Sequence, residues 1–179
     1  MLISEEYREQ NKQLHSEGIY GTSGHKMAPL VNGMSIVHKT RNILDYGCGQ
    51  RLLERALGFP IKNYDPCIEG LDSPPEPANI VVCGDVLEHI EPGCLDAVLD
   101  DLHRVTHIVG MFHIDTRPAL KILPDGRNAH LIQKPAEWWF PKLFARWAAV
   151  HIVDALFESR TNPGVVKSLG FYATVERKR

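Results

Sequence analysis

The fold of this chain is decided by a ten-residue stretch, Asn42-Ile-Leu-Asp-Tyr-Gly-Cys-Gly-Gln-Arg51. Its apolar start predicts the end of a buried strand. Gly47 and Gly49 then allow a tight turn whose backbone can approach a ligand, because neither carries a side chain. From Leu52 onward the apolar residues recur at helical spacing. A strand, a glycine turn and a helix in this order place a ligand at the carboxyl end of a parallel strand, beside the N-terminus of a helix.

The composition is that of a single globular domain. The chain has 179 residues, 44% of them hydrophobic, and a net charge of −2, so it carries no overall positive field for nucleic acid or an anionic membrane. No apolar run approaches the ~20 residues that span a bilayer, and the N-terminus lacks the features of a secretion signal. The four cysteines form no C-x-x-C pair, which is typical of free thiols. We therefore expect a cytoplasmic protein that does not insert into membranes.

Three kinds of glycine turn compete for the stretch. A dinucleotide-binding G-x-G-x-x-G motif needs a glycine where Leu52 stands, and a P-loop needs a Gly-Lys-Ser/Thr sequence that is missing. The remaining pattern, Asp45-Tyr-Gly-Cys-Gly49, resembles the first motif of the class I S-adenosylmethionine-dependent methyltransferases. The resemblance implies a loop under the methionine part of the cofactor, with Asp45 orienting it. The third glycine that the family often has would fall at Arg51, and the pattern is also compatible with a purely structural turn.

A second carboxylate, Asp65, follows Asp45 by 20 residues, after a short predicted strand. An acid at this distance is placed to accept hydrogen bonds from both ribose hydroxyls of a nucleoside cofactor. Upstream, the glycine-rich segment 18–26 is compatible with a surface linker or with a lid over the cofactor. By resemblance to the family, the residues that contact S-adenosylmethionine are Tyr20, Asp45, Gly47, Cys48, Gly49, Asp65, Pro66, Cys67, Gly84, Asp85 and Val86.

The order of the predicted elements gives the fold class. A continuous apolar run at residues 79–84 predicts a central parallel strand. The proline-rich segment 69–78 leaves no room for the helix and third strand that the methyltransferase family has there. We predict a Rossmann-like, doubly wound, mostly parallel α/β sheet with an antiparallel last strand and without the usual third, edge strand. Residues 1–41 are expected to form an N-terminal helix followed by the loop that could be a lid or a linker, and residues 42–179 a single methyltransferase domain.

A cluster of polar residues follows the apolar run. Asp85, Glu88 and His89 have i, i+3, i+4 spacing, so one helical turn can bring them together. With His130 farther along the chain, the pattern resembles two metal-assisted branches of the superfamily, the ubiquinone-biosynthesis O-methyltransferases and the 2′-O-methyltransferases of small RNAs. The resemblance implies a divalent metal, magnesium or another ion, bound by Asp85, Glu88, His89 and His130, with Asp85, His89 and His130 in catalysis. Many members without a metal share Leu-Glu-His-Ile, and there the histidine shapes the pocket or acts as a base.

These patterns predict an S-adenosylmethionine-dependent methyltransferase that methylates an oxygen of a small or medium-sized acceptor. The irregular segment 116–133 carries basic residues that favour an anionic acceptor, although exposed Lys and Arg are usually a solvated face. Two alternatives stay open. One is a protein that binds adenosylmethionine without catalysis. The other is a methyltransferase of nucleic-acid ends, suggested by the same basic residues and by the tryptophans.

Overall fold

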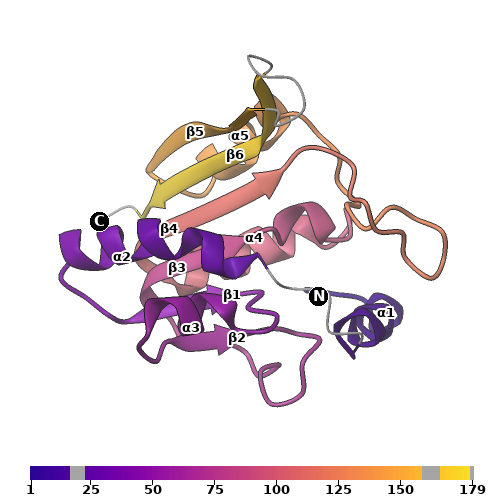
Figure 1. Ribbon diagram of the computed structural model, residues 1–179, viewed down its shortest axis with the longest axis horizontal. Coiled ribbons are helices and arrows are strands. Elements are labelled where there is room, and N and C mark those ends of the chain that lie inside the picture. Colours follow the sequence, from indigo (N-terminus) through magenta and orange to yellow (C-terminus); the bar gives the residue numbers. More distant parts are fainter. Residues whose placement is uncertain (17–22, 159–165, 178–179) are drawn as a thin grey trace.

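The computed structural model describes residues 1–16, 23–158 and 166–177, which form one six-stranded sheet covered by helices on both faces (Figure 1). The strands are β1 (Ile43–Tyr46), β2 (Lys62–Tyr64), β3 (Ala78–Gly84), β4 (Thr106–Asp115), β5 (Ala149–Glu158) and β6 (Val166–Glu176). The helices are α1 (Glu5–Ser16), α2 (Ala28–Val37), α3 (Leu52–Leu57), α4 (Leu95–Val105) and α5 (Ala136–Phe144), with the short 3₁₀ helices η1 (Gly24–Met27) and η2 (Leu87–His89).

The strand order is β2-β1-β3-β4-β6-β5. β1 pairs in parallel with β2 and β3, β3 pairs in parallel with β4, and β6 runs antiparallel to both β4 and β5. The prediction of a mostly parallel sheet with an antiparallel last strand is confirmed. The missing edge strand is also confirmed within the described chain, because β2 forms the edge and the proline-rich segment up to residue 77 contains no strand.

Alternate side chains of the central strands enter two separate cores. In β3, Val81 and Cys83 face the core beneath α4 and α5, whereas Ile80 and Val82 face the core beneath α2 and α3. All four side chains are at most 1% exposed. A parallel strand covered on both faces needs apolar residues at successive positions, which explains the continuous apolar run in the sequence.

α2 is an element that the sequence pattern does not predict. Its helical apolar spacing is interrupted by Asn32 and Gly33, so it lacks a clear stripe. In the fold it nonetheless buries Val31 completely against the sheet, and the preceding Met27 of η1 enters the same core. Tertiary packing therefore stabilises a helix whose local sequence gives little signal.

α1 lies beyond the carboxyl ends of the parallel strands, on the right of Figure 1. The hydroxyl of Ser4 accepts a hydrogen bond from the backbone N–H of Tyr7 at 3.2 Å and so caps the helix. Tyr7 and Leu14 then pack with Leu123 and Ala129, from the loop after β4, in a small third core. α1 and this loop therefore form one wall opposite the strand ends.

Arg51 occupies the position of the family's frequent third glycine, and it is left-handed, with φ 56° and ψ 36°. A residue with a Cβ is destabilised there by roughly 1–2 kcal/mol. Urea unfolding of Arg51→Gly and Arg51→Ala measures this cost, since both variants lack the arginine side chain and differ only in backbone freedom. Glycine removes the left-handed penalty but gains freedom in the unfolded chain. We expect the free energy of unfolding of Arg51→Gly to exceed that of Arg51→Ala by about 1 kcal/mol, a net value that includes both effects. Equal stabilities would show that the loop follows another path.

Candidate active site

A cavity of about 750 Å³ lies where the carboxyl ends of the parallel strands face α1. Its volume falls within the roughly 300–1,000 Å³ of small-molecule and cofactor sites. The carboxyl edge is also where ligands bind in open parallel sheets. The sequence-predicted residues that line the cavity are Gly47, Gly49, Asp65, Pro66, Cys67, Asp85, Val86, Glu88, His89 and His130.

The glycine loop after β1 is held tightly against the neighbouring strand ends. The backbone N–H groups of Gly47 and Cys48 donate to the carbonyl oxygen of Tyr64, at 2.8 and 3.0 Å. Gly47 has φ +80°, and a Cβ there would stand 2.4 Å from Cγ2 of Val86. Glycine is therefore required at this position both by the backbone conformation and by the available space.

Asp65 fixes the other side of the loop through hydrogen bonds to its backbone. Its Oδ2 accepts a hydrogen bond from the backbone N–H of Gly49 at 3.1 Å, and its Oδ1 accepts one from Cys67 at 3.0 Å. Nε2 of His15, in α1, lies 3.9 Å from the same Oδ2. Because Asp65 is 5% exposed and lines the cavity, its carboxylate is placed to accept hydrogen bonds from a ligand's hydroxyl groups.

Asp45 lies nearby and is 5% exposed. Burial raises its pKa to about 7, and the charges of Asp65 and Glu54 act in the same direction. The charge of this carboxyl group therefore changes near neutral pH. A cation bound close to it would favour the ionised form.

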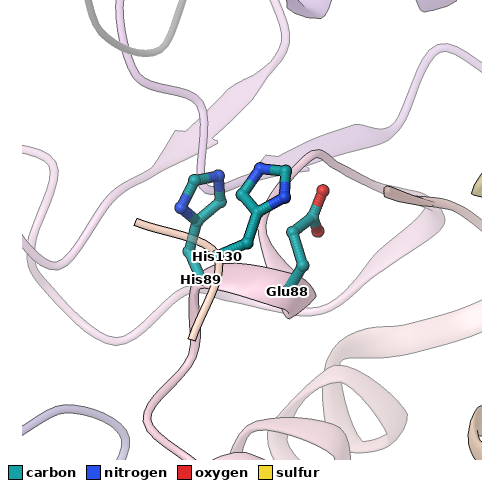
Figure 2. A group of neighbouring side chains, drawn as sticks. All are labelled: Glu88, His89 and His130. Atoms are coloured by element: carbon teal, nitrogen blue, oxygen red, sulfur yellow. The ribbon is translucent and has the colours of Figure 1, made fainter. Parts of the chain in front are cut away.

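Three of the predicted metal ligands meet at the cavity (Figure 2). Glu88 and His89 come from η2, and His130 comes from the loop after β4. One ligand atom from each side chain lies within 4.8 Å of the other two. The rings of His89 and His130 meet edge to face, with their centroids 4.6 Å apart. The structure therefore brings His130 together with two residues that precede it by 42 and 41 positions.

Backbone carbonyls orient both imidazole rings. Nδ1 of His89 lies 2.8 Å from the carbonyl oxygen of Ala129, and Nδ1 of His130 lies 2.5 Å from that of Arg117. Since a carbonyl can only accept, each Nδ1 carries a proton and, in the neutral ring, Nε2 carries the lone pair. Metal-binding histidines in proteins have this arrangement.

Glu88 is fully buried. Its Oε1 accepts a hydrogen bond from the backbone N–H of Asp115 at 2.9 Å, whereas its Oε2 has no hydrogen-bond partner in the described part of the chain. Burial raises the pKa of Glu88 well above its usual value, and Asp85 contributes in the same direction. Burial, together with the adjacent His130, lowers the pKa of His89 to about 4. Imidazole nitrogen and carboxylate oxygen are both ligands of divalent metal ions. A divalent cation bound here would supply positive charge next to the Glu88 carboxyl group and favour its ionised form.

Asp85, the fourth predicted ligand, lies outside this group. It has φ +55°, and its Oδ1 forms a short hydrogen bond with Nδ1 of His113 on β4. The spacing predicts one helical turn that contains Asp85, Glu88 and His89, but η2 begins only at Leu87. The left-handed turn at Asp85 directs its side chain to the neighbouring strand instead.

Three other predicted residues do not line the cavity. Asp45 and Cys48 are both 5% exposed, and burial raises the pKa of the Cys48 thiol. Gly84 packs under η1, where an added Cβ would stand 2.1 Å from Sδ of Met27. Tyr20 lies outside the described residues.

Several residues that line the cavity were not predicted from the sequence. They are Tyr7, Asn11 and His15 of α1, Met27 of η1, His113 of β4 and Tyr172 of β6. Ser23 and Lys26, which also line it, belong to the segment 18–26 for which a lid was one of the two interpretations. Among the residues not predicted, only His113 gave a local signal, as a polar residue near the carboxyl end of an otherwise apolar strand. The others reach the cavity through the packing of separate elements.

Solved structures share this architecture. A 1,6-didemethyltoxoflavin-N1-methyltransferase from Burkholderia thailandensis matches with a TM-score of 0.58 and 14% identity, over 97% of this chain and 88% of its own. The DhpI–SAH complex matches with a TM-score of 0.56 and 18% identity, over 96% of this chain and 98% of its own. The magnesium protoporphyrin IX methyltransferase ChlM from Synechocystis PCC 6803 matches with a TM-score of 0.56 and 14% identity, over 86% of this chain and 83% of its own. The fold is that of the class I methyltransferases.

All three of these structures contain bound S-adenosylhomocysteine. At 14–18% identity the likeness concerns the methyltransferase fold and not the substrate. No protein-family model matches the sequence, and no curated protein matches it significantly. Within the described residues, no helix of this methyltransferase fold has the length and apolarity that a bilayer-spanning segment needs.

Proposed function

We propose that this chain is an S-adenosylmethionine-dependent methyltransferase that methylates an oxygen of a small, anionic acceptor. The observation that carries the proposal is the buried Asp65, which lines the cavity. Its carboxylate accepts hydrogen bonds from the backbone N–H groups of Gly49 and Cys67. In a methyltransferase fold this is where a nucleoside's ribose hydroxyls would find an acceptor at the end of the second strand.

The cavity offers a place for each part of the cofactor. Gly47 leaves room for the methionine part, and Asp45 nearby would ionise in response to its ammonium and sulfonium groups. Asp65 would accept hydrogen bonds from the ribose hydroxyls. Pro66 and Cys67, which line the cavity next to it, would border the adenine.

We also propose that Glu88, His89 and His130 hold a divalent cation. The unpartnered Oε2 of Glu88 and the two Nδ1–H groups fixed by carbonyls support this assignment, and Asp85 is not required for it. Two imidazoles and one carboxylate suit iron, manganese or zinc better than magnesium, which prefers oxygen ligands. When bound, such an ion lowers the pKa of a hydroxyl group and orients it.

The chain itself would supply orientation and the exclusion of water. Holding the acceptor oxygen in line with the methyl group and the sulfur atom removes much of the entropic barrier to transfer. α1 and the loop after β4 line the cavity on the side away from the sheet, and covering this side limits competing reactions with water. Lys26, Arg117 and Lys121 line the cavity, and the guanidinium of Arg117 is paired with Asp115. The two lysines favour an acceptor with a carboxylate or phosphate group.

The proposed reaction can be tested with isotopically labelled S-adenosylmethionine, MnCl₂ and three probe acceptors: 3,4-dihydroxybenzoate, catechol and tyramine. Mass spectrometry should detect a methyl ether of 3,4-dihydroxybenzoate and an equal amount of S-adenosylhomocysteine. Methylation of the tyramine nitrogen would contradict transfer to oxygen. Binding of S-adenosylhomocysteine without transfer to any probe would favour the non-catalytic alternative.

Two of the three tryptophans do not support the nucleic-acid alternative, and the third, Trp138, is partly buried against the same core. Trp139 and Trp147 are 0% and 2% exposed and lie in the core beneath α4 and α5. Neither can stack on a base. Binding to a short RNA that does not weaken with added salt would exclude several phosphate contacts.

Binding of S-adenosylmethionine is expected to release protons below neutral pH. In the ligand-free chain burial and the neighbouring Asp65 raise the pKa of Asp45 to about 7, so the group is mostly protonated about one pH unit below that value. The cofactor's positive charges favour the carboxylate, and the affinity should therefore rise with pH up to about 7 and then level off. Calorimetry in two buffers of different ionisation enthalpy measures the released protons. Asp45→Asn should release fewer; equal release would assign the titration to another group.

A further inference from the structure

Asp85, His113 and Tyr172 form a second polar group in the cavity. It comes from three strands or strand ends and is separate from the group of Glu88, His89 and His130. Asp85 and His113 are joined twice. The backbone N–H of Asp85 donates to the carbonyl oxygen of His113 at 3.1 Å, and Oδ1 of Asp85 bonds to Nδ1 of His113.

Asp85 is ionised at neutral pH. Burial by itself would raise its pKa, but the hydrogen bond and charge of His113, a hydrogen bond from Ser23 and the charge of Lys26 outweigh burial and lower the pKa to about 2. A carboxylate can only accept, so Nδ1 of His113 must be the donor. This fixes the proton of the neutral ring on Nδ1 and leaves the lone pair on Nε2.

The His113 ring is held in place by its hydrogen bond to Asp85 and by its contact with the ring of Tyr172. His113 stands opposite Tyr172 in the antiparallel β4–β6 pair, and the two ring centroids are 4.5 Å apart. The side chain is 15% exposed and lines the cavity. Within the described chain, Nε2 of His113 has no hydrogen-bond partner. The ring is therefore oriented by its neighbours, with one nitrogen available to a ligand.

We propose that His113 is the general base of the methyl transfer, and that Asp85 is a positioning residue that holds the proton of the neutral ring on Nδ1, so that Nε2 carries the lone pair. This rests on the proposed methyltransferase function. As the acceptor oxygen attacks the methyl carbon, its O–H proton passes to Nε2, the carbon–sulfur bond breaks, and its electron pair stays on sulfur. The positive charge of the sulfonium thus moves to the His113 ring, next to the carboxylate of Asp85, and the proton then leaves to water.

The role fits the physical demands of a general base. A side chain that takes a proton must have a fixed tautomer and a partner that stabilises its charged form, and an acid–imidazole pair supplies both. His89 meets these demands less well, because burial lowers its pKa to about 4 and its Nδ1 faces a neutral carbonyl. His113 is thus better suited than His89 to accept the proton.

The test uses His113→Gln, Asp85→Asn and, as a matched control, His107→Gln. His107 lies on the same strand but is exposed, at the end away from the cavity. With S-adenosylmethionine and 3,4-dihydroxybenzoate, His113→Gln should lower kcat by about 10²–10⁴-fold and Asp85→Asn by at least about tenfold. The affinity of His113→Gln for S-adenosylhomocysteine should change less than about twofold, and His107→Gln should match the unchanged chain.

Nitrogen-15 NMR of histidine-labelled protein adds a readout that a merely structural role would not move. The His113 signal, assigned by its loss in His113→Gln, should show a protonated Nδ1 and a bare Nε2, and Asp85→Asn should introduce the other tautomer. A proton on Nε2 in the unchanged chain, or His113→Gln that keeps more than about a tenth of kcat, would overturn the proposal while leaving the methyltransferase function intact. An unchanged chain that binds the cofactor but methylates no probe would instead contradict the proposed function, and the assignment of a base with it.

Discussion

Asp65→Ala is expected to bind S-adenosylhomocysteine about 100-fold more weakly than the unchanged chain, a loss of about 2.8 kcal/mol. The carboxylate would accept hydrogen bonds from two ribose hydroxyls, and a bond to a charged group contributes about 1.5–3 kcal/mol. The same oxygens hold the backbone N–H groups of Gly49 and Cys67. The variant therefore loses contacts to the ligand and order in the loop at once.

Isothermal calorimetry measures this loss, and Asp72→Ala is the matched control. Asp72 is an exposed acid in the same connection after β2, so its removal changes the net charge equally without touching the cavity. Its affinity should stay within about twofold of the unchanged chain. If Asp65→Ala and Asp72→Ala bind alike, Asp65 does not hold the ribose, and the cofactor lies elsewhere in the cavity.

Glu88→Gln is expected to lose at least about 100-fold in affinity for Mn²⁺, because an amide replaces the one anionic ligand of the group. In the presence of EDTA its stability should equal or exceed that of the unchanged chain. Burial raises the pKa of Glu88 well above its usual value, which favours the protonated form of the ion-free side chain, and glutamine imitates that form. Mn²⁺ should raise the melting temperature of the unchanged chain and not that of the variant.

His130→Ala extends the test to the imidazole ligands. It should also lose Mn²⁺ binding, whereas His151→Ala, which removes an exposed histidine on β5, should not. Elemental analysis after dialysis gives the same comparison without a chosen ion. If the unchanged chain binds no divalent ion by either method, Glu88, His89 and His130 form a polar pocket and not a metal site.

The parts of the fold that follow from local sequence could be predicted. The glycine turn after β1, the buried run of β3 and the prolines that exclude an edge strand each depend on backbone rules that act within a few residues. The same is true of the carboxylates at strand ends, since parallel strands bring their carboxyl ends to one edge. Asp65 and Gly47 therefore reach the cavity as the pattern indicates.

The rest depends on contacts between distant segments. Asp85 turns to His113 because β3 and β4 are neighbours and its own backbone is left-handed, and helical spacing cannot show this. His15 approaches Asp65 only because α1 packs on the loop after β4. The second wall of the cavity is thus a property of tertiary packing, and a periodic pattern carries no information on it.

A crystal structure of the chain with S-adenosylhomocysteine is the most direct test of the proposed cofactor site. The ribose hydroxyls should lie within hydrogen-bond distance of the Asp65 carboxylate, and the amino-acid end of the ligand should rest on Gly47, close to Asp45. An empty cavity at saturating ligand, or a nucleoside bound away from Asp65, would contradict the assignment of this chain as an S-adenosylmethionine-dependent methyltransferase.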